Sequence, residues 1–188
     1  INNMNYRVKI EKDLILDNIF NNINENKKKD KLNICLNYHG NLNNSYEANI
    51  RNIKLEKFEK LFLLENINWI NIQKEVSKEE EEIMKKYNIL DLHKLIDNNE
   101  NSFLETILIL KEVDFLISTD TCYLHIAGSL NIKNIFALLP LSSDWRWTKD
   151  EYTNWYPNIK LIRQREIFEW DDVLSKLEIE LKNKLKNK

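Results

Sequence analysis

Apolar residues along this chain fall into two alternating kinds of segment. Short runs rich in β-branched and aromatic side chains are typical of buried strands, and apolar residues that recur every three or four positions are typical of amphipathic helices. The short runs predict strands at residues 32–38, 68–73, 88–92, 113–118, 132–139 and 159–162. Helical spacing predicts helices at residues 14–23, 55–64, 77–87, 102–111, 124–130 and 170–185.

This alternation predicts one doubly wound α/β domain with a parallel sheet, because parallel strands need long crossover connections. Residues 31–188 are assigned to that domain. Residues 1–30 are assigned to a helical lead-in, of which 24–30 form a polar linker. Two helix starts carry the residue pairing of a capping box, Ser77 with Glu80 and Ser102 with Glu105.

The stretch of residues 113–140 contains the most informative pattern. A strand, a polar turn, a helix and a second strand follow one another there, which is a βαβ unit. In open parallel sheets, ligands bind beyond the carboxyl ends of the strands. Asp120, Thr121 and His125 fall at that edge, where the start of the helix offers unpaired N–H groups to an anion. We therefore predict that a phosphate-bearing ligand binds there.

Composition and charge narrow the partners. A hydrophobic content of 43% and a charged content of 31% are those of a globular protein with a substantial core. The net charge of -2 gives no overall attraction to nucleic acid or to an anionic membrane, so neither is expected as a partner. Cys35 and Cys122 form neither a disulfide framework nor a metal-binding pattern, and no metal cofactor is expected.

The chain shows no targeting signal that would place it outside the cytoplasm. No apolar run approaches the roughly 20 residues that span a bilayer. No signal peptide is visible either, so we expect a cytoplasmic protein without a membrane span. The chain opens at Ile1 rather than at a methionine, and we expect its true N-terminus to lie upstream.

Glycine is scarce in a sequence dominated by Asn, Lys and Ile, a skew that we interpret as coding bias. The two glycines therefore stand out. Gly40 follows the first predicted strand, where a turn needs positive φ or a close backbone approach. Gly128 lies inside a predicted helix, where glycine costs about 1 kcal/mol relative to alanine. We expect that this helix packs very closely on the sheet.

Three ordered motifs occupy the second half of the chain. The first, D-hydrophobic-hydrophobic-I-S/T-x-D-T-x-x-x-H-x-A-G, covers residues 114–128, and the second, L-L-P-x-x-x-D-W-R-W, covers residues 138–147. The third consists of W-Y-P at 155–157 and R-Q at 163–164. Weaker matches are Y-H-G-N at 38–41 with Arg51, and I-Q at 72–73. In these motifs the chain resembles the C-terminal half of glycosyltransferase family 9, over residues from about 32 to 181.

This resemblance implies a fold and an activity. Family 9 enzymes are heptosyltransferase-like and have the GT-B fold, so the chain is expected to be its Rossmann-like C-terminal lobe, which binds the donor. The donor is a nucleotide-diphosphate-sugar, from which the whole enzyme transfers a sugar to a hydroxyl acceptor. In the family, the general base comes from the N-terminal lobe, which is not in this chain. No catalytic residue is therefore expected here, and the missing lobe, often attached to tetratricopeptide repeats, is an expected partner.

The candidate ligand-binding residues come from the motifs. The hydroxyl of Thr121 and the N–H groups of Cys122 and Tyr123 can face a diphosphate at the helix start. His125 lies one helical turn beyond Thr121 and can donate to a phosphate oxygen. Asp120 is expected to cap the helix, orient His125 or accept a hydroxyl of the sugar or ribose. The remaining candidates are Gly40, Asn41 and Arg51 across the crevice, together with Gln73 and Arg146.

Each assignment has a structural alternative. Asp120 and Thr121 can serve only as a helix cap, and His125 can be a satisfied core histidine. Trp145, Trp147 and Trp155, with Tyr152 and Tyr156, can stack on a base or sugar or can anchor a long loop. For the whole chain, the alternative to a transferase half is a non-catalytic module that binds a sugar nucleotide or another protein.

Overall fold

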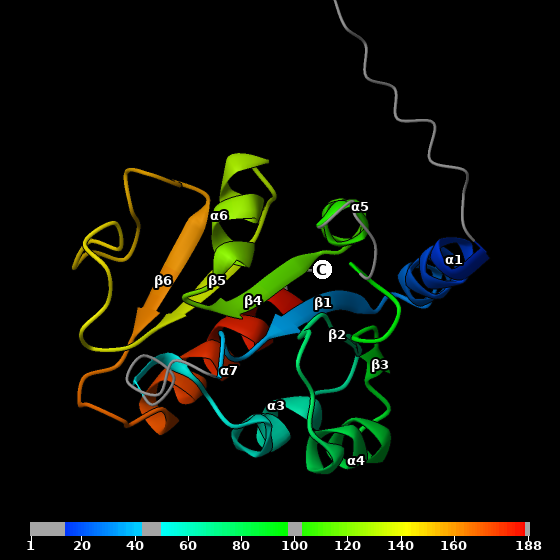
Figure 1. The fold of residues 1–188 in the computed structure, drawn as a ribbon, viewed down its shortest axis with the longest axis horizontal. Helices are drawn as coiled ribbons and strands as arrows, with labels where there is room; N and C mark the ends of the chain where they lie inside the picture. Colours follow the sequence, from blue (N-terminus) through cyan, green and yellow to red (C-terminus); the bar gives the residue numbers. More distant parts are fainter. Residues whose placement is uncertain (1–13, 43–49, 98–102, 187–188) are drawn as a thin grey trace, which may run out of the picture.

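Six parallel strands form one sheet in the computed structural model, which describes residues 14–42, 50–97 and 103–186 (Figure 1). The strands are β1 (Leu32–Asn37), β2 (Ile67–Asn71), β3 (Leu90–Asp91), β4 (Phe115–Thr119), β5 (Ile135–Leu139) and β6 (Ile159–Arg163). Their order across the sheet is β3-β2-β1-β4-β5-β6. This is the order of Rossmann-like doubly wound folds, so the predicted α/β class is confirmed.

Helices cover both faces of the sheet (Figure 1). On one face lie α1 (Leu14–Lys28), α5 (Leu104–Glu112) and α6 (Cys122–Ser129). On the other lie the 3-10 helix η1 (Leu55–Phe58), α3 (Glu59–Phe62), α4 (Lys78–Lys86) and α7 (Asp171–Lys186). Successive strand residues alternate between the two cores: Phe115 and Ile117 face the α7 side, and Leu116 faces the α6 side. Because both faces are buried, β5 is a continuous apolar run and β4 is nearly one.

The α1 helix extends further than its apolar pattern predicts. Residues 24–28, which we expected to be a polar linker, form its last turns. Their polarity reflects exposure to solvent rather than the end of the helix, and most of these side chains are exposed. Earlier in the helix, Ile19 and Ile23 are buried in the same core as residues of α5 and α6. The α1 helix is therefore packed as part of the folded domain.

Several element boundaries differ from the predicted ones. The strand expected at 88–92 is limited to the two residues of β3, and the helix expected at 55–64 begins as the 3-10 helix η1. The capping box at the start of α4 is confirmed. Ser77 Oγ accepts from Glu80 N at 3.2 Å, and Ser77 N donates to Glu80 Oε2 at 2.8 Å. Ser102 lies outside the described residues, and α5 follows Phe103, whose φ is 68°.

Asparagine adopts the left-handed backbone conformation that usually selects glycine. Neither glycine has a positive φ, whereas Asn66, Asn88, Asn131 and Asn134 have φ values of 62°, 55°, 52° and 59°. These residues stand at the ends of helices and strands, where asparagine tolerates this conformation better than most residues. Part of the asparagine-rich composition therefore has a structural use, and coding bias alone is an incomplete interpretation.

The topology places a crevice between β1 and β4. From β1 the chain winds outward to β2 and β3, then returns to β4 beside β1 and continues to β5 and β6. The connections leave β1 and β4 in opposite directions, which opens a crevice beyond their carboxyl ends. The connection of residues 140–158 between β5 and β6 contains no helix. It runs back along the outer edge of β6, where Tyr152 and Lys160 form an antiparallel bridge (Figure 1).

Candidate ligand-binding site

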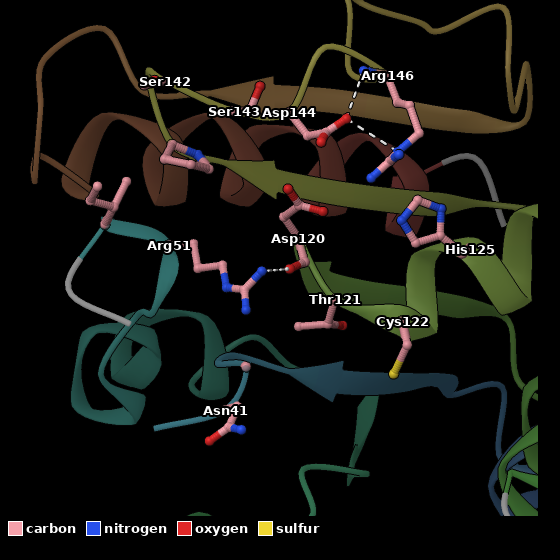
Figure 2. A pocket seen from close by; sticks show the side chains of 13 residues that line it. Asn41, Arg51, Asp120, Thr121, Cys122, His125, Ser142, Ser143, Asp144 and Arg146 are labelled. Carbon is pink, nitrogen blue, oxygen red and sulfur yellow. Dashed lines mark hydrogen bonds and ion pairs between the residues drawn. The ribbon is translucent and has the colours of Figure 1, made fainter. Parts of the chain in front are cut away.

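A cleft of about 680 Å³ lies at the crevice that the topology predicts, beyond the carboxyl ends of β1, β4 and β5 (Figure 2). Residues from three distant stretches line it, namely Gly40, Asn41, Ile50, Arg51, Asp120, Thr121, Cys122, His125, Pro140, Ser142, Ser143, Asp144 and Arg146. A second hollow of about 370 Å³ shares four of these residues with the first: Gly40, Asn41, Thr121 and Cys122. Gln73 and Tyr123 line only this second hollow. The structure thus gathers all ten candidate residues around two adjoining hollows.

A hydroxyl network joins the ends of β1 and β4 beneath the cleft. Thr121 Oγ1 donates to Asn37 Oδ1 at 2.8 Å, and Ser118 Oγ donates to the same oxygen at 2.9 Å. The two hydroxyl oxygens lie 3.0 Å apart. Because the proton of Thr121 is held by Asn37, the hydroxyl would have to leave this network to donate to a ligand. Thr121 therefore fixes the start of α6 to the neighbouring strand.

The start of α6 is not capped by a side chain. Thr121 occupies the N-cap position, yet its side chain makes no capping hydrogen bond. The suggestion that Thr121 serves only as a side-chain cap is therefore wrong. Burial raises the pKa of the Cys122 thiol, while the N–H groups of Cys122 and Tyr123 act in the opposite direction. These two N–H groups would therefore stabilise a negative charge placed at the start of α6.

Gly40 is distinguished by a close approach of the Arg51 side chain rather than by its backbone angle. A Cβ atom at Gly40 would lie 3.0 Å from Nη2 and 3.1 Å from Nε of Arg51. The Gly40 N–H donates to Asn52 Oδ1 at 2.9 Å, which fixes the exit of β1 against the Arg51 segment. Arg51 Nη1 in turn donates to the backbone oxygen of Asp120 at 3.3 Å, so the guanidinium spans the cleft from β1 to β4 (Figure 2).

His125 forms one wall of the cleft and is held by two aromatic rings. Its Nδ1 lies 3.2 Å from the hydroxyl of Tyr156, and its ring stacks on Trp147 with centroids 5.3 Å apart. Trp147 is only 2% exposed, so it anchors the loop between β5 and β6. Of the two predicted roles for this aromatic cluster, Trp147 and Tyr156 take the structural one and orient His125.

Asp120 is a half-buried acid at the centre of the site. Burial raises the pKa of its carboxyl group, and the nearby Asp144 adds to this effect. The Trp147 indole, the Arg51 guanidinium and His125 favour the carboxylate and offset part of the shift. The indole N–H of Trp147 comes close without completing a hydrogen bond. Figure 2 shows the Asp120 side chain between Arg51 and His125.

Arg146 is held by a partner within its own loop. Its Nε lies 3.1 Å from Asp144 Oδ1, which also accepts the Arg146 backbone N–H at 3.0 Å (Figure 2). The guanidinium lies 5.7 Å from the ring centroid of Trp145. Arg146 thus lines the cleft as one half of an ion pair.

Gln73 lies beneath the exit of β1 and binds backbone groups there. Its Oε1 accepts from Asn37 Nδ2 at 2.6 Å, His39 N at 3.2 Å and Tyr38 N at 3.3 Å. Its Nε2 lies 3.1 Å from His39 Nδ1. With 4% of its surface exposed, Gln73 shapes the β1 exit loop from below.

Two further residues organise the site but were not among the candidate ligand-binding residues. Asn37 accepts both hydroxyls of the network, and its signal was a polar residue at the end of an apolar strand. Arg163 donates to the backbone oxygens of Pro140, Trp147 and Thr148 at 3.2, 2.7 and 2.6 Å, and also to Ser143 Oγ. Arg163 thereby fixes the β5–β6 loop. The sequence marked it only as part of the R-Q pair at 163–164, without this role.

Compared with models of known protein families, with curated proteins and with solved structures, the chain matches none of them. Over residues 14–42, 50–97 and 103–186, His, Cys, Asp and Glu side chains form no group of three that could hold a metal ion. Within the same ranges, no helix has both the length and the apolar character needed to cross a bilayer.

Proposed function

We propose that this domain binds a nucleoside diphosphate sugar and forms the donor-binding lobe of a GT-B glycosyltransferase resembling family 9. The observation that carries this proposal is the convergence at the β1–β4 crevice. Arg51, the first turn of α6 with His125, and Arg146 come from three separate stretches of the chain and meet around one cleft. This is the place where doubly wound sheets bind phosphate-bearing ligands.

The cleft offers complementary groups to a diphosphate. The first N–H groups of α6 and the positive end of its dipole favour one phosphate. Arg51, which already reaches across to Asp120, supplies a fixed positive charge with several donors. His125 presents its ring to the same cleft while Tyr156 holds its Nδ1. Together these groups would stabilise the diphosphate that leaves during sugar transfer.

A calorimetric titration with ADP, GDP, UDP and their sugar conjugates tests the proposal. We expect one of these nucleotides to bind the wild-type chain, and Arg51→Met to weaken that binding at least 10-fold. Lys54→Met is the matched control, since Lys54 lies three residues further on and its side chain is 79% exposed. The control should bind as well as wild type. Absence of binding to all the nucleotides, or equal affinity in Arg51→Met, would refute the assignment.

The isolated chain should bind the donor without transferring the sugar. Glycosyl transfer needs the acceptor and a base on the opposite side of the sugar from the leaving diphosphate, and such positioning contributes about 7–11 kcal/mol. We expect that contribution to come from another lobe. Incubation with a bound donor and a panel of hydroxyl acceptors, followed by mass spectrometry, should show no product. Turnover by the 188-residue chain that persists in His125→Ala would contradict the half-enzyme proposal.

A further inference from the structure

The β5–β6 loop exposes two tryptophans beside the cleft. The rings of Trp145 and Trp155 are 71% and 54% exposed, whereas Trp147 on the same loop is 2% exposed. Trp147 and Tyr156 already anchor the loop against α6 through His125. The two exposed indoles are therefore not needed to hold the loop. Leaving such large apolar rings in water forgoes burial free energy, and a contiguous exposed pair is typical of a binding surface.

The two rings are held in a fixed arrangement. Their centroids lie 5.5 Å apart and their planes cross at 77°, so they form a corner. One buried hydroxyl ties the two parts of the loop together. Thr153 Oγ1 donates to the Arg146 backbone oxygen at 2.7 Å and accepts from Trp155 N at 3.2 Å. A ligand that binds this corner would find the rings already ordered, which lowers the entropic cost of binding.

The corner adjoins the rim of the cleft. Asp144 and Arg146, which flank Trp145 in sequence, both line the cleft. The Arg146 guanidinium lies near the ring of Trp145, and its ion pair with Asp144 offers hydrogen-bonding groups beside the indole. A ligand bound at the corner would thus meet one apolar wall and one polar wall.

The size and surroundings of the corner favour a small ligand over a protein. A covered indole contributes about 150–250 Å² of buried surface, while a stable protein interface buries about 800 Å² on each partner. Two indoles fall well short of that area. The exposed residues of the same loop include the polar Lys149, Asp150, Glu151 and Asn154 as well as the apolar Leu141 and Tyr152. The polar side chains suit a small ligand that carries hydroxyl groups.

We propose that the Trp145–Trp155 corner is a carbohydrate-binding subsite that holds a pyranose ring. The axial C–H groups of an all-equatorial pyranose form an apolar face whose hydrogens carry partial positive charge. Such a face complements the negative face of an indole ring. The hydroxyl groups at the edge of the sugar then meet the polar residues around the corner. This subsite is distinct from the nucleotide site and does not depend on the proposed donor function.

Ligand-observed NMR with cellohexaose, chitohexaose and maltohexaose tests the proposal. We expect the wild-type chain to bind one of the two β-linked oligosaccharides, cellohexaose or chitohexaose, weakly, with a Kd of about 1 mM. Trp145→Ala and Trp155→Ala should each weaken binding at least 10-fold while leaving the thermal midpoint unchanged. Phe168→Ala is the control, since Phe168 is an exposed aromatic (59%) outside this loop. It should bind as wild type does.

Three results would overturn the carbohydrate subsite. They are no binding of the three oligosaccharides at ~10 mM, unchanged affinity in both tryptophan variants, or self-association that Trp145→Ala abolishes. The last result would assign the corner to a second copy of the chain. Arg51→Met separates this proposal from the donor proposal. That variant should keep the oligosaccharide and lose the nucleotide, whereas the tryptophan variants should do the reverse.

Discussion

Replacing Gly128 by alanine should destabilise the protein, although alanine is the better helix former. Gly128 lies in α6, and a Cβ atom there would stand 2.5 Å from both Cγ and Cδ1 of Tyr156 and 3.1 Å from its Cβ. These atoms are at the base of the tyrosine side chain, so the ring cannot avoid the clash by moving only its far end. The sequence indicated close packing on the sheet, but the partner is a ring from the β5–β6 loop.

The expected magnitude follows from three contributions. Alanine gains about 1 kcal/mol of helix propensity over glycine. Overpacking costs about 1–3 kcal/mol, and displacing Tyr156 also weakens its hydrogen bond to His125, worth about 0.5–1.5 kcal/mol. The net loss in the free energy of unfolding should be about 0.5–3.5 kcal/mol. Gly128→Leu should lose at least as much, because its larger side chain enters the same space.

Urea unfolding with linear extrapolation measures this loss, provided that the slope m is unchanged. Ser129→Ala is the control, an exposed position of the same helix where alanine should be neutral or slightly stabilising. The decisive comparison is a double-mutant cycle. In a Tyr156→Ala background the clash is gone, so Gly128→Ala should stabilise by about 1 kcal/mol. A stabilising Gly128→Ala in the wild-type background would refute the packing argument.

Three further predictions concern side chains that line the two hollows of the site. Because burial raises the pKa of Asp120, the contribution of this carboxyl group to stability is lost as pH rises from its unfolded pKa through its folded pKa. The stability of Asp120→Asn relative to wild type should therefore be greater at pH 7 than at pH 3 in unfolding experiments, and a smaller difference at pH 7 would contradict this. Iodoacetamide should modify the exposed Cys122 and spare the buried Cys35. A bound nucleotide should slow the modification of Cys122 in a time course followed by mass spectrometry, and equal rates with and without nucleotide would place the ligand elsewhere. Gln73→Ala removes the amide oxygen that accepts three hydrogen bonds at the β1 exit. The free energy of unfolding, measured with urea, should fall by at least about 2 kcal/mol. An unchanged value would mean that water replaces the amide.

The sequence predicted the sheet well because strands buried on both faces have a strong local signature. The apolar runs that become β4 and β5 were placed within three residues of their observed ends. Their parallel pairing follows from the alternation with helices, and so does the meeting of Gly40 and Thr121 at one edge. The predicted end of α1 is wrong because the polar residues 24–28 suggest a linker, whereas they form the solvent-exposed last turn of the helix.

The contacts of individual side chains could not be predicted in the same way. The partner of Thr121 is Asn37, 84 positions earlier, and the ring that meets Gly128 belongs to Tyr156, which lies in a loop without periodicity. Hydrophobic patterns determine which face of an element is buried, but they do not specify which polar atoms meet across it. The roles of Gln73 and Arg163 depend on hydrogen bonds of this kind between distant segments.

The position of α7 also bears on how the polypeptide folds while it is being made. Although α7 follows all other described elements, Val173 and Leu177 belong to the same core cluster as Phe58. The pair of Lys57 and Asp171, at 2.7 Å, joins positions 114 residues apart. Chains emerge from the ribosome with their N-terminal parts first. A nascent chain that ends before Asp171 would thus expose the part of this core that α7 covers, and chaperones and proteases recognise such exposed apolar surface.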